Sequence, residues 1–272
     1  MPKSGDYGYS EETAAKNADL RGLLMMHTQI CKNRVSQRCP YQYMDLNAGP
    51  GIYTPRAAQA DLWGNAEQPA PAEIHGSPLI FLDCAQTRRI PYRAVLFEKD
   101  NRHRASLTAA LSAHPSVTIE GDHDDAPRHM CNCPRCGRLA QGIIYSDESG
   151  HIPPFQLLAT LASQPHYKQV DLLIYYSATA HKRARGLFGG DRLTQCLKPI
   201  PKKEWLVREP RGRHQWTFLL GTNWEDFPAW GKRGFYRIGS ERGQRVLKRL
   251  DSSADELREA ETSVCTALSF LL

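Results

Sequence analysis

Four acidic residues stand at the ends of four apolar segments of the sequence. Asp45 closes Tyr-Gln-Tyr-Met-Asp, Glu98 closes Ala-Val-Leu-Phe-Glu, and Asp122 and Asp147 close the two segments that follow. Carboxylates accept hydrogen bonds from hydroxyl and amino groups, which a nucleotide-like ligand offers on its ribose and base. Because random surface charge would not be phased with successive strands, the pattern predicts one shared ligand crevice. Surface charge is the alternative for each acid taken singly.

A glycine-rich turn, Asn47-Ala-Gly-Pro-Gly51, follows the first of these acids. Gly49 and Gly51 carry no Cβ, so the backbone can approach a ligand closely there. In a strand–loop–helix unit, such a turn faces the adenosine or amino-acid end of a nucleotide-like cofactor. A tight structural turn needs the same residues, so the turn alone leaves both interpretations open.

A cysteine cluster follows the third acid. Cys133-Pro-Arg-Cys136-Gly has the spacing of a zinc knuckle, and Cys131 is a third soft ligand. The fourth ligand is His129, His123 or a distant residue. A redox pair and unligated thiols are the alternatives. The five other cysteines lie in or beside apolar segments and are predicted to be buried small hydrophobic residues: Cys31, Cys39, Cys84, Cys196 and Cys265.

Basic residues concentrate in the segment 181–250, which holds 17 Lys and Arg against six Asp and Glu. Pairs such as Lys202-Lys203 alternate there with aromatic residues such as Trp205 and Trp216. Cations bind phosphates and aromatic faces stack bases, so nucleic acid is an expected partner. A solvated basic surface with tryptophans in the core is the alternative. His181 and His214 are expected at the surface or as satisfied core residues, and 177–190 as a loop gating the crevice.

The elements that must position these residues follow from apolar periodicity and from Gly and Pro punctuation. Strands alternate with helices, which predicts an α/β, Rossmann-like fold: an open, mostly parallel sheet with helices on both faces and an antiparallel C-terminal part. Ligands bind such sheets at the carboxyl ends of the strands. The expected helices are 14–31, 77–86, 101–113, 154–163 and 241–250, and the expected strands are 41–46, 93–97, 116–120, 142–147, 170–176, 205–208, 215–220 and 234–238.

The same patterns give a domain organisation. We expect an N-terminal helical leader over 1–40, a Rossmann-like domain over 41–250 and a C-terminal tail over 251–272. Within the domain we expect a loop insertion at 53–76, a Cys-rich loop at 122–140 and the basic segment at 181–250.

The composition is that of a globular protein. The chain has 272 residues, of which 41% are apolar and 24% charged, and its net charge is +6. No apolar run is long enough to span a membrane, and the first residues lack the apolar core of a signal peptide. We therefore expect a cytoplasmic protein without membrane contact, whose cysteines are thiols or metal ligands rather than disulfides.

Four blocks of the sequence, YMDLNAGPGIY, HGSPLIFLDCA, LFEKD and YSDESG, resemble class I S-adenosylmethionine-dependent methyltransferases. More narrowly, the chain resembles the three-Cys-motif partner (TcmP-like) family of bacteria and phages. The resemblance extends over about half of the chain, from about residue 41 to 176.

The resemblance implies S-adenosylmethionine as cofactor and assigns roles to single residues. The loop would line the methionine and adenosine side, Glu98 would hold the ribose, Asp122 would face the adenine amino group, and Asp147 would stand where the methyl group meets its acceptor. Asp147 would then be the catalytic residue or a cofactor ligand only. The implied cofactor residues are Asp45, Asn47, Ala48, Gly49, Gly51, Glu98, Asp122 and Asp147, and the candidate metal ligands are His129, Cys131, Cys133 and Cys136.

Three functions follow from these patterns. The leading hypothesis is a methyltransferase that acts on DNA or RNA. The second is a non-catalytic partner that binds a nucleotide or nucleic acid beside a neighbouring enzyme, because Asp147-Glu-Ser-Gly150 lacks the Pro-Pro-aromatic motif of amino-directed nucleic-acid methyltransferases. The third is a dinucleotide-dependent oxidoreductase, which the glycine spacing fits poorly because no third glycine stands two residues after Gly51.

Overall fold

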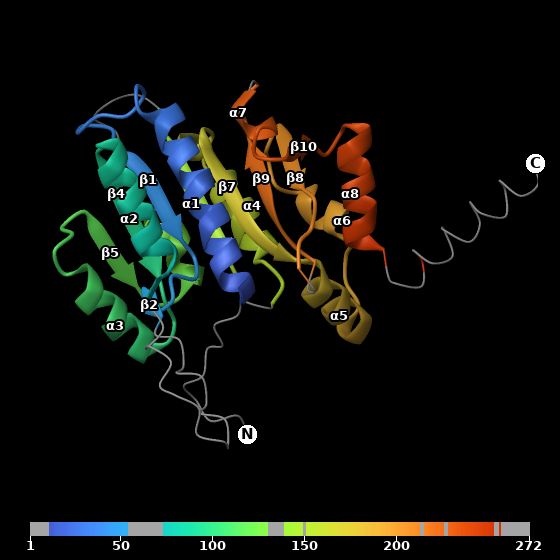
Figure 1. The fold of residues 1–272 in the computed structure, drawn as a ribbon, viewed down its shortest axis with the longest axis horizontal. Coiled ribbons are helices and arrows are strands. Elements are labelled where there is room, and N and C mark those ends of the chain that lie inside the picture. Colours follow the sequence, from blue (N-terminus) through green and yellow to red (C-terminus); the bar gives the residue numbers. More distant parts are fainter. Residues whose placement is uncertain are drawn as a thin grey trace, which may run out of the picture. The chain divides into compact units, whose positions relative to one another are not determined.

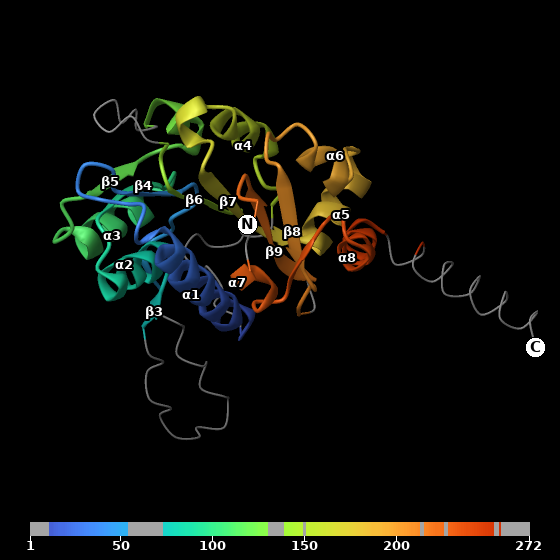
Figure 2. The same ribbon diagram turned by 90° about the horizontal axis from the view of Figure 1, so that it is seen from above.

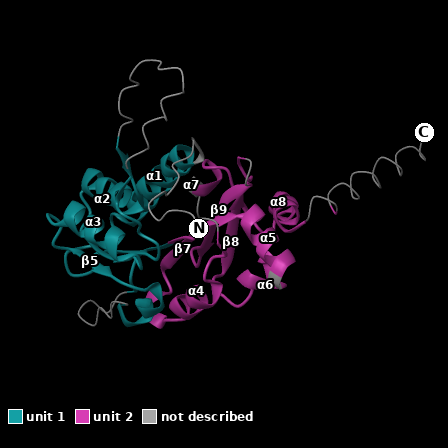
Figure 3. Ribbon diagram, turned by 90° about the horizontal axis from the view of Figure 1, so that it is seen from below, with its two compact units in different colours: residues 1–145 teal, residues 146–272 magenta. Residues whose placement is uncertain are grey.

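The computed structural model describes residues 11–53, 73–129, 139–148, 151–212, 215–225, 228–252 and 256 (Figure 1). These residues form two compact units, 1–145 and 146–272, which Figure 3 colours separately. Among the described helices, none has the length and apolar character that a membrane span requires. The predicted division into leader, domain and tail stays a prediction.

Unit 1 is built on parallel strands in the order β6-β1-β4-β5. Every residue of β1 and β6 is buried, as expected for the central strands of a parallel sheet covered on both faces. The parallel arrangement of these strands confirms the predicted fold class for this half of the chain. The strands are β1 (Tyr41–Asp45), β4 (Tyr92–Phe97), β5 (Val117–Glu120) and β6 (Gly142–Asp147).

Helices cover this sheet and connect its strands. Figures 1 and 2 show α1, α2 and α3 together on one face of the strands, and the 3-10 helix η1 packs on β4, where the His129 ring meets the Phe97 ring edge-on. Pro78 in the first turn of α2 and Asp100 as the N-cap of α3 explain where these two helices begin. The elements are α1 (Glu11–Cys31), α2 (Ser77–Arg88), α3 (Asn101–Leu111), η1 (His123–His129), and the two-stranded pair β2 (Ile52–Tyr53) and β3 (Ile74–His75).

Unit 2 is antiparallel. Strand β7 pairs with β9, β9 with β8, and β8 with β10, all in opposite directions, which confirms the predicted antiparallel C-terminal part. Helix α4 packs on β7, and α8 packs on β8 and β10. The elements are α4 (Phe155–Ala162), η2 (Pro165–Tyr167), β7 (Val170–Ser177), α5 (Ala178–Phe188), α6 (Leu193–Leu197), β8 (Glu204–Arg208), β9 (Trp216–Thr222), α7 (Pro228–Gly231), β10 (Phe235–Arg237) and α8 (Glu241–Asp251).

One segment differs from its prediction. The expected loop 177–190 is mostly the helix α5, which Ser177 caps by accepting a hydrogen bond from Ala180 N–H. Its run of basic residues conceals a helical pattern, because Lys and Arg are good helix formers that carry no apolar signal. A loop that gates a crevice is therefore not what this segment forms.

Candidate functional site

Parallel pairing brings the ends of the strands of unit 1 to one edge of its sheet. Asp45, the last residue of β1, pairs with Leu96 of β4 and with Tyr145 of β6. Glu98 follows two residues after Leu96, and Asp147 ends β6 two residues after Tyr145. Asp45 and Glu98 thus lie at the same edge of the sheet, at the ends of adjacent strands.

Asp45 is fully buried and held by its own segment. The Tyr43 hydroxyl donates to Oδ2 at 2.9 Å, and the Asn47 backbone N–H donates to Oδ1 at 3.1 Å. Burial and the nearby Asp45 charge raise the pKa of Tyr43 well above its usual range, so its hydroxyl stays protonated and can donate. Through its hydrogen bond with the Asn47 N–H, the Asp45 side chain therefore holds the first residue of the glycine-rich loop in place.

The loop itself has the backbone that its glycines predict. Gly49 and Gly51 have φ of +66° and +80°, in the region that L side chains avoid. A Cβ at Gly49 would collide with the Tyr53 hydroxyl, and one at Gly51 would lie 2.9 Å from Leu107 Cδ1. Both glycines are thus required by the turn and by its close neighbours.

The glycine-rich loop contacts the next strand and carries a buried hydrogen-bond acceptor. The Ala48 N–H donates to the carbonyl of Phe97 at 2.9 Å, so the loop lies directly beside the residue that precedes Glu98. Asn47 Oδ1 is buried, and no residue in the described ranges gives it a hydrogen bond. Since buried polar atoms are nearly always paired, this acceptor is available to a donor from outside the described residues.

Glu98 is largely buried, with 11% of its side chain exposed. Its Oε1 accepts the Asp100 N–H at 2.8 Å and lies 3.8 Å from His103 Nδ1. In the part of the chain that the structure describes, no group donates to Oε2. One oxygen of Glu98 is therefore positioned by the start of α3, while the other has capacity to accept ligand hydroxyls.

The other two acids differ from this pair. Asp122 is engaged with the protein: its Oδ2 lies 3.1 Å from Lys99 Nζ, and its Oδ1 accepts the Asp124 N–H. Both contacts hold the pKa of Asp122 below its usual value, the Asp124 N–H most strongly. Asp147 is 8% exposed. Their predicted roles, at the adenine and at the methyl group, stay predictions.

The predicted zinc site falls mostly outside the described residues, because Cys131, Cys133 and Cys136 are not among them. His129 is described, and its Nδ1 lies 3.4 Å from Glu120 Oε1. The alternative ligand His123 lies beside Asp122 and Asp124, with ligand atoms within 4.8 Å of one another. Zinc thus stays a prediction.

The other cysteines correct part of the sequence analysis. Cys31 and Cys84 are buried thiols, as expected, and burial raises the pKa of Cys84 to about 11. Cys196 is only half-buried. Cys39 is disulfide-bonded, so the expectation of a buried thiol there was wrong. The expectation that the cysteines are thiols or metal ligands rather than disulfides is therefore wrong for Cys39 as well, because composition and spacing alone do not reveal which cysteines pair. Cys265 lies outside the described residues.

Comparison with known proteins shows the fold alone. The chain is 13% identical to protein LPL1258 from Legionella pneumophila, with a TM-score of 0.55 over 80% of this chain and 89% of that one. It also matches the DszA carbon methyltransferase (9% identity, TM-score 0.49) and the CurJ carbon methyltransferase (10%, 0.46). These matches cover 79% and 80% of this chain, but only 55% and 56% of those chains. No protein-family model and no curated protein sequence matches the chain.

The basic segment of unit 2 divides into structural and exposed cations. Lys182 Nζ donates to Gln215 Oε1 at 3.1 Å and to the Arg249 carbonyl at 3.0 Å. Arg185 donates to the Asp251 carbonyl at 2.8 Å. These two side chains stabilise the packing of α5 and α8, so they are less available to phosphates than the sequence suggests.

The aromatic residues of this segment are largely core residues. Trp216, Trp224 and Trp230 are buried, and Trp216 packs against Tyr175 with ring centroids 5.8 Å apart. His181 is buried too, with its ring nitrogens bonded to the Tyr176 hydroxyl and the Asp191 carbonyl. The core alternative is confirmed for these residues, whereas His214 lies outside the described ones.

Four of the exposed cations of this segment lie on α8, whose apolar side is buried through Val246, Leu247 and Leu250. Its other side exposes four basic residues and one acid, and Arg242 also lies over the Tyr236 ring at 4.3 Å. The exposed charged residues of the helix are Glu241, Arg242, Arg245, Lys248 and Arg249.

Sequence analysis overlooked two neighbours of the site. Tyr43 could have been found, because residues two apart in a strand share a face and Tyr43 therefore lies beside Asp45. His103 approaches Glu98 from within α3, and only the geometry of the strand–helix turn reveals it.

Proposed function

We propose that the chain is an S-adenosylmethionine-dependent methyltransferase whose acceptor is a nucleic acid. The observation that carries the cofactor assignment is the contact between the glycine-rich loop and the end of β4. The Ala48–Phe97 hydrogen bond places the loop beside Glu98, whose Oε2 can still accept hydrogen bonds. The loop also carries the buried acceptor Asn47 Oδ1, to which no described residue donates.

The donor set suits this cofactor. Its methionine end carries an ammonium group, which can donate a hydrogen bond to Asn47 Oδ1. Its ribose carries two hydroxyls, which can donate hydrogen bonds to Glu98 Oε2. Gly49 and Gly51 permit the positive φ of the loop that carries Asn47, and their missing side chains make room for Tyr53 and Leu107. When bound, the cofactor supplies a methyl group on a positively charged sulfur.

The residues of the chain then have to orient and polarise the acceptor. Methyl transfer is an in-line displacement, so positioning lowers much of the barrier. Asp147, at the end of β6, is the candidate that holds or removes a proton of the acceptor amino or hydroxyl group. A role limited to cofactor positioning is the alternative for Asp147.

The nucleic-acid part of the proposal rests on α8. Its exposed cations number four against a single exposed acid on the helix, and Lys248 forms no ion pair with a described residue. Such a face suits the phosphate backbone, and binding through it would weaken steeply with salt. Replacing both Arg245 and Lys248 by Gln should lower the affinity for an oligonucleotide and reduce its salt dependence.

The first test is calorimetric binding of S-adenosylmethionine to wild type and to Asp45→Ala. We expect micromolar binding that the substitution weakens by about 100-fold, because the loop loses the hydrogen bond that anchors its Asn47 N–H and the Tyr43 hydroxyl loses its acceptor. That factor corresponds to about 2.7 kcal/mol. Asp125→Ala is the matched control, since this exposed carboxylate pairs with Arg128 outside the loop and should leave binding unchanged.

A second measurement separates the functions. Transfer of labelled methyl groups to pooled DNA or RNA, lost on Asp147→Asn, would support the enzyme. Cofactor binding without transfer to any nucleic acid would favour the non-catalytic partner instead. A folded wild-type protein that binds no S-adenosylmethionine would contradict the proposal as a whole.

A further inference from the structure

A pocket of about 580 Å³ lies in unit 2, beside the start of β7. Its lining includes three lysines from two segments, together with the end of α4 and one residue after β9. None of these residues belongs to the proposed cofactor site. The lining residues used below are Ser163, Lys168, Lys202, Lys203 and Asn223.

Asn223 makes this pocket a built feature. Its Oδ1 accepts the Lys203 N–H at 2.7 Å, and its Nδ2 donates to the Lys168 carbonyl at 2.8 Å. The amide is 9% exposed and uses both ends of its side chain to join the two segments that carry the lysines. The three ammonium groups are thereby attached to backbone that is fixed in place.

Lys202 is the unusual member of the set, because it is 9% exposed. Its ammonium group donates to the Val170 carbonyl at 2.5 Å, and within the described residues it makes no other hydrogen bond. An ammonium group has three donors, so two N–H groups of Lys202, a residue that lines the pocket, lack an acceptor among the described residues. Burying such a group is costly unless something else pairs with it.

The charges around the pocket favour an anion. The buried carboxylate of Asp171 attracts the charged form of Lys202, and Lys203 pairs with the exposed Glu225 at 3.0 Å. Lys168 is exposed and has no ion-pair partner among the described residues. Three cations thus face two acids. At the end of α4, Ser163 donates to the carbonyl of Ala159 through both N–H and Oγ, so this carbonyl is already paired.

We propose that this pocket binds a phosphate group, with Lys202 as its central ligand and Lys168 and Lys203 at its rim. Lysine ammonium groups are common phosphate ligands, and the volume lies within the usual range for small-molecule sites. The phosphate comes from a free nucleotide or from a polynucleotide.

The pocket also has a pH signature. Burial lowers the pKa of Lys202 to about 8, against the opposing influence of Asp171. An anion binds the charged form, so affinity should be high at pH 7 and fall as the pH rises through about 8. Exposed lysines titrate near 10.4 and would not produce this change.

The test is a titration of the whole chain with sulfate, a tetrahedral dianion whose charge is constant over this pH range. The affinity is measured from chemical-shift changes in NMR spectra. Lys202→Met should weaken binding by about tenfold, as loss of one charge-assisted contact does. Lys168→Gln should weaken it by a smaller factor without affecting folding. Lys198→Gln, an exposed lysine outside the pocket, is the matched control and should change nothing.

Adenosine monophosphate and a short oligonucleotide then compete with sulfate, and the stronger competitor identifies the source of the phosphate. Equal weakening by the Lys198 and Lys168 variants would overturn the proposal, because it would reveal diffuse surface attraction. So would affinity that does not fall between pH 7 and 9, or competitors that both fail. Because sulfate binding involves no residue of the cofactor site, this proposal and the proposed function can fail separately.

Discussion

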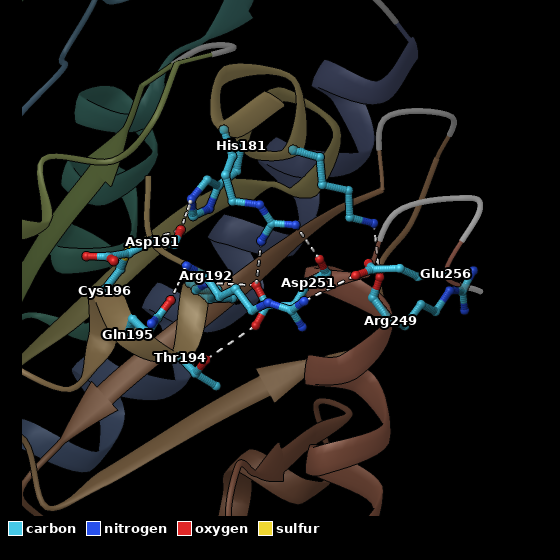
Figure 4. Close-up of polar contacts among 12 residues, drawn as sticks. His181, Asp191, Arg192, Thr194, Gln195, Cys196, Arg249, Asp251 and Glu256 are labelled. Carbon is cyan, nitrogen blue, oxygen red and sulfur yellow. Dashed lines mark hydrogen bonds and ion pairs between the residues drawn. The ribbon is translucent and has the colours of Figure 1, made fainter. Parts of the chain in front are cut away.

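Two buried aspartates, Asp45 in unit 1 and Asp251 in unit 2, show how differently the two halves use a carboxylate. Asp251 accepts the Leu193 N–H at 2.7 Å and the Thr194 hydroxyl at 3.5 Å, and lies 3.8 Å from Arg185 (Figure 4). Its partners therefore come from α5 and α6, and it joins both to α8. The Asp45 contacts given above come from its own strand and loop.

The difference distinguishes a structural acid from a binding acid. Contacts that join separate elements stabilise the fold, and their loss weakens the packing of every element that they join. Contacts within one loop fix only that loop, whose shape matters to whatever binds there. We therefore expect substitutions at Asp251 to lower stability, and changes in the glycine-rich loop mainly to lower ligand affinity.

The largest effect is expected for Asp251→Ala. It leaves the Leu193 N–H without its acceptor and removes the carboxylate that pairs with the half-buried Arg185, which keeps only its hydrogen bond to the backbone carbonyl of residue 251. These losses should lower the free energy of unfolding by about 3 kcal/mol. Denaturant titration measures this. Glu256→Ala removes an exposed pair with Arg192 and should cost less than about 1 kcal/mol. Equal losses in the two variants would contradict the distinction.

A smaller effect is expected for Gly51→Ala. The positive φ costs about 1–2 kcal/mol for an L residue, and the new methyl group would press on Leu107. Cofactor affinity should fall as well, because the loop must shift. Gly186→Ala is the matched control: its Cβ would meet nothing within 4 Å, and in α5 it should stabilise the fold by up to about 1 kcal/mol. Unchanged affinity in the Gly51 variant would show that the loop does not contact the cofactor.

The same contrast explains how much the sequence could predict. The loop of unit 1 was accessible because its acid, its glycines and its strand end are contiguous, and local rules of backbone conformation apply to them. The Asp251 network was not, because its members lie up to 66 residues apart and only packing brings them together. For the same reason Lys182 and Arg185 were taken for phosphate-binding cations, and the pocket beside Lys202 was not foreseen.

The smallest expected effect concerns His181, on α5 beside the Asp251 network. Its Nε2 faces the Asp191 carbonyl and so donates, which leaves Nδ1 to accept from the Tyr176 hydroxyl. Burial lowers the pKa of His181, partly opposed by that carbonyl and by Asp251. Between pH 7 and 5 the unfolded chain therefore binds more protons than the folded one, and stability should fall as the pH drops through about 6.5.

Denaturant titrations at both pH values should show a smaller decrease in His181→Gln than in wild type. A stability loss of the same size in the variant would assign the pH dependence to other groups and leave His181 a purely structural residue.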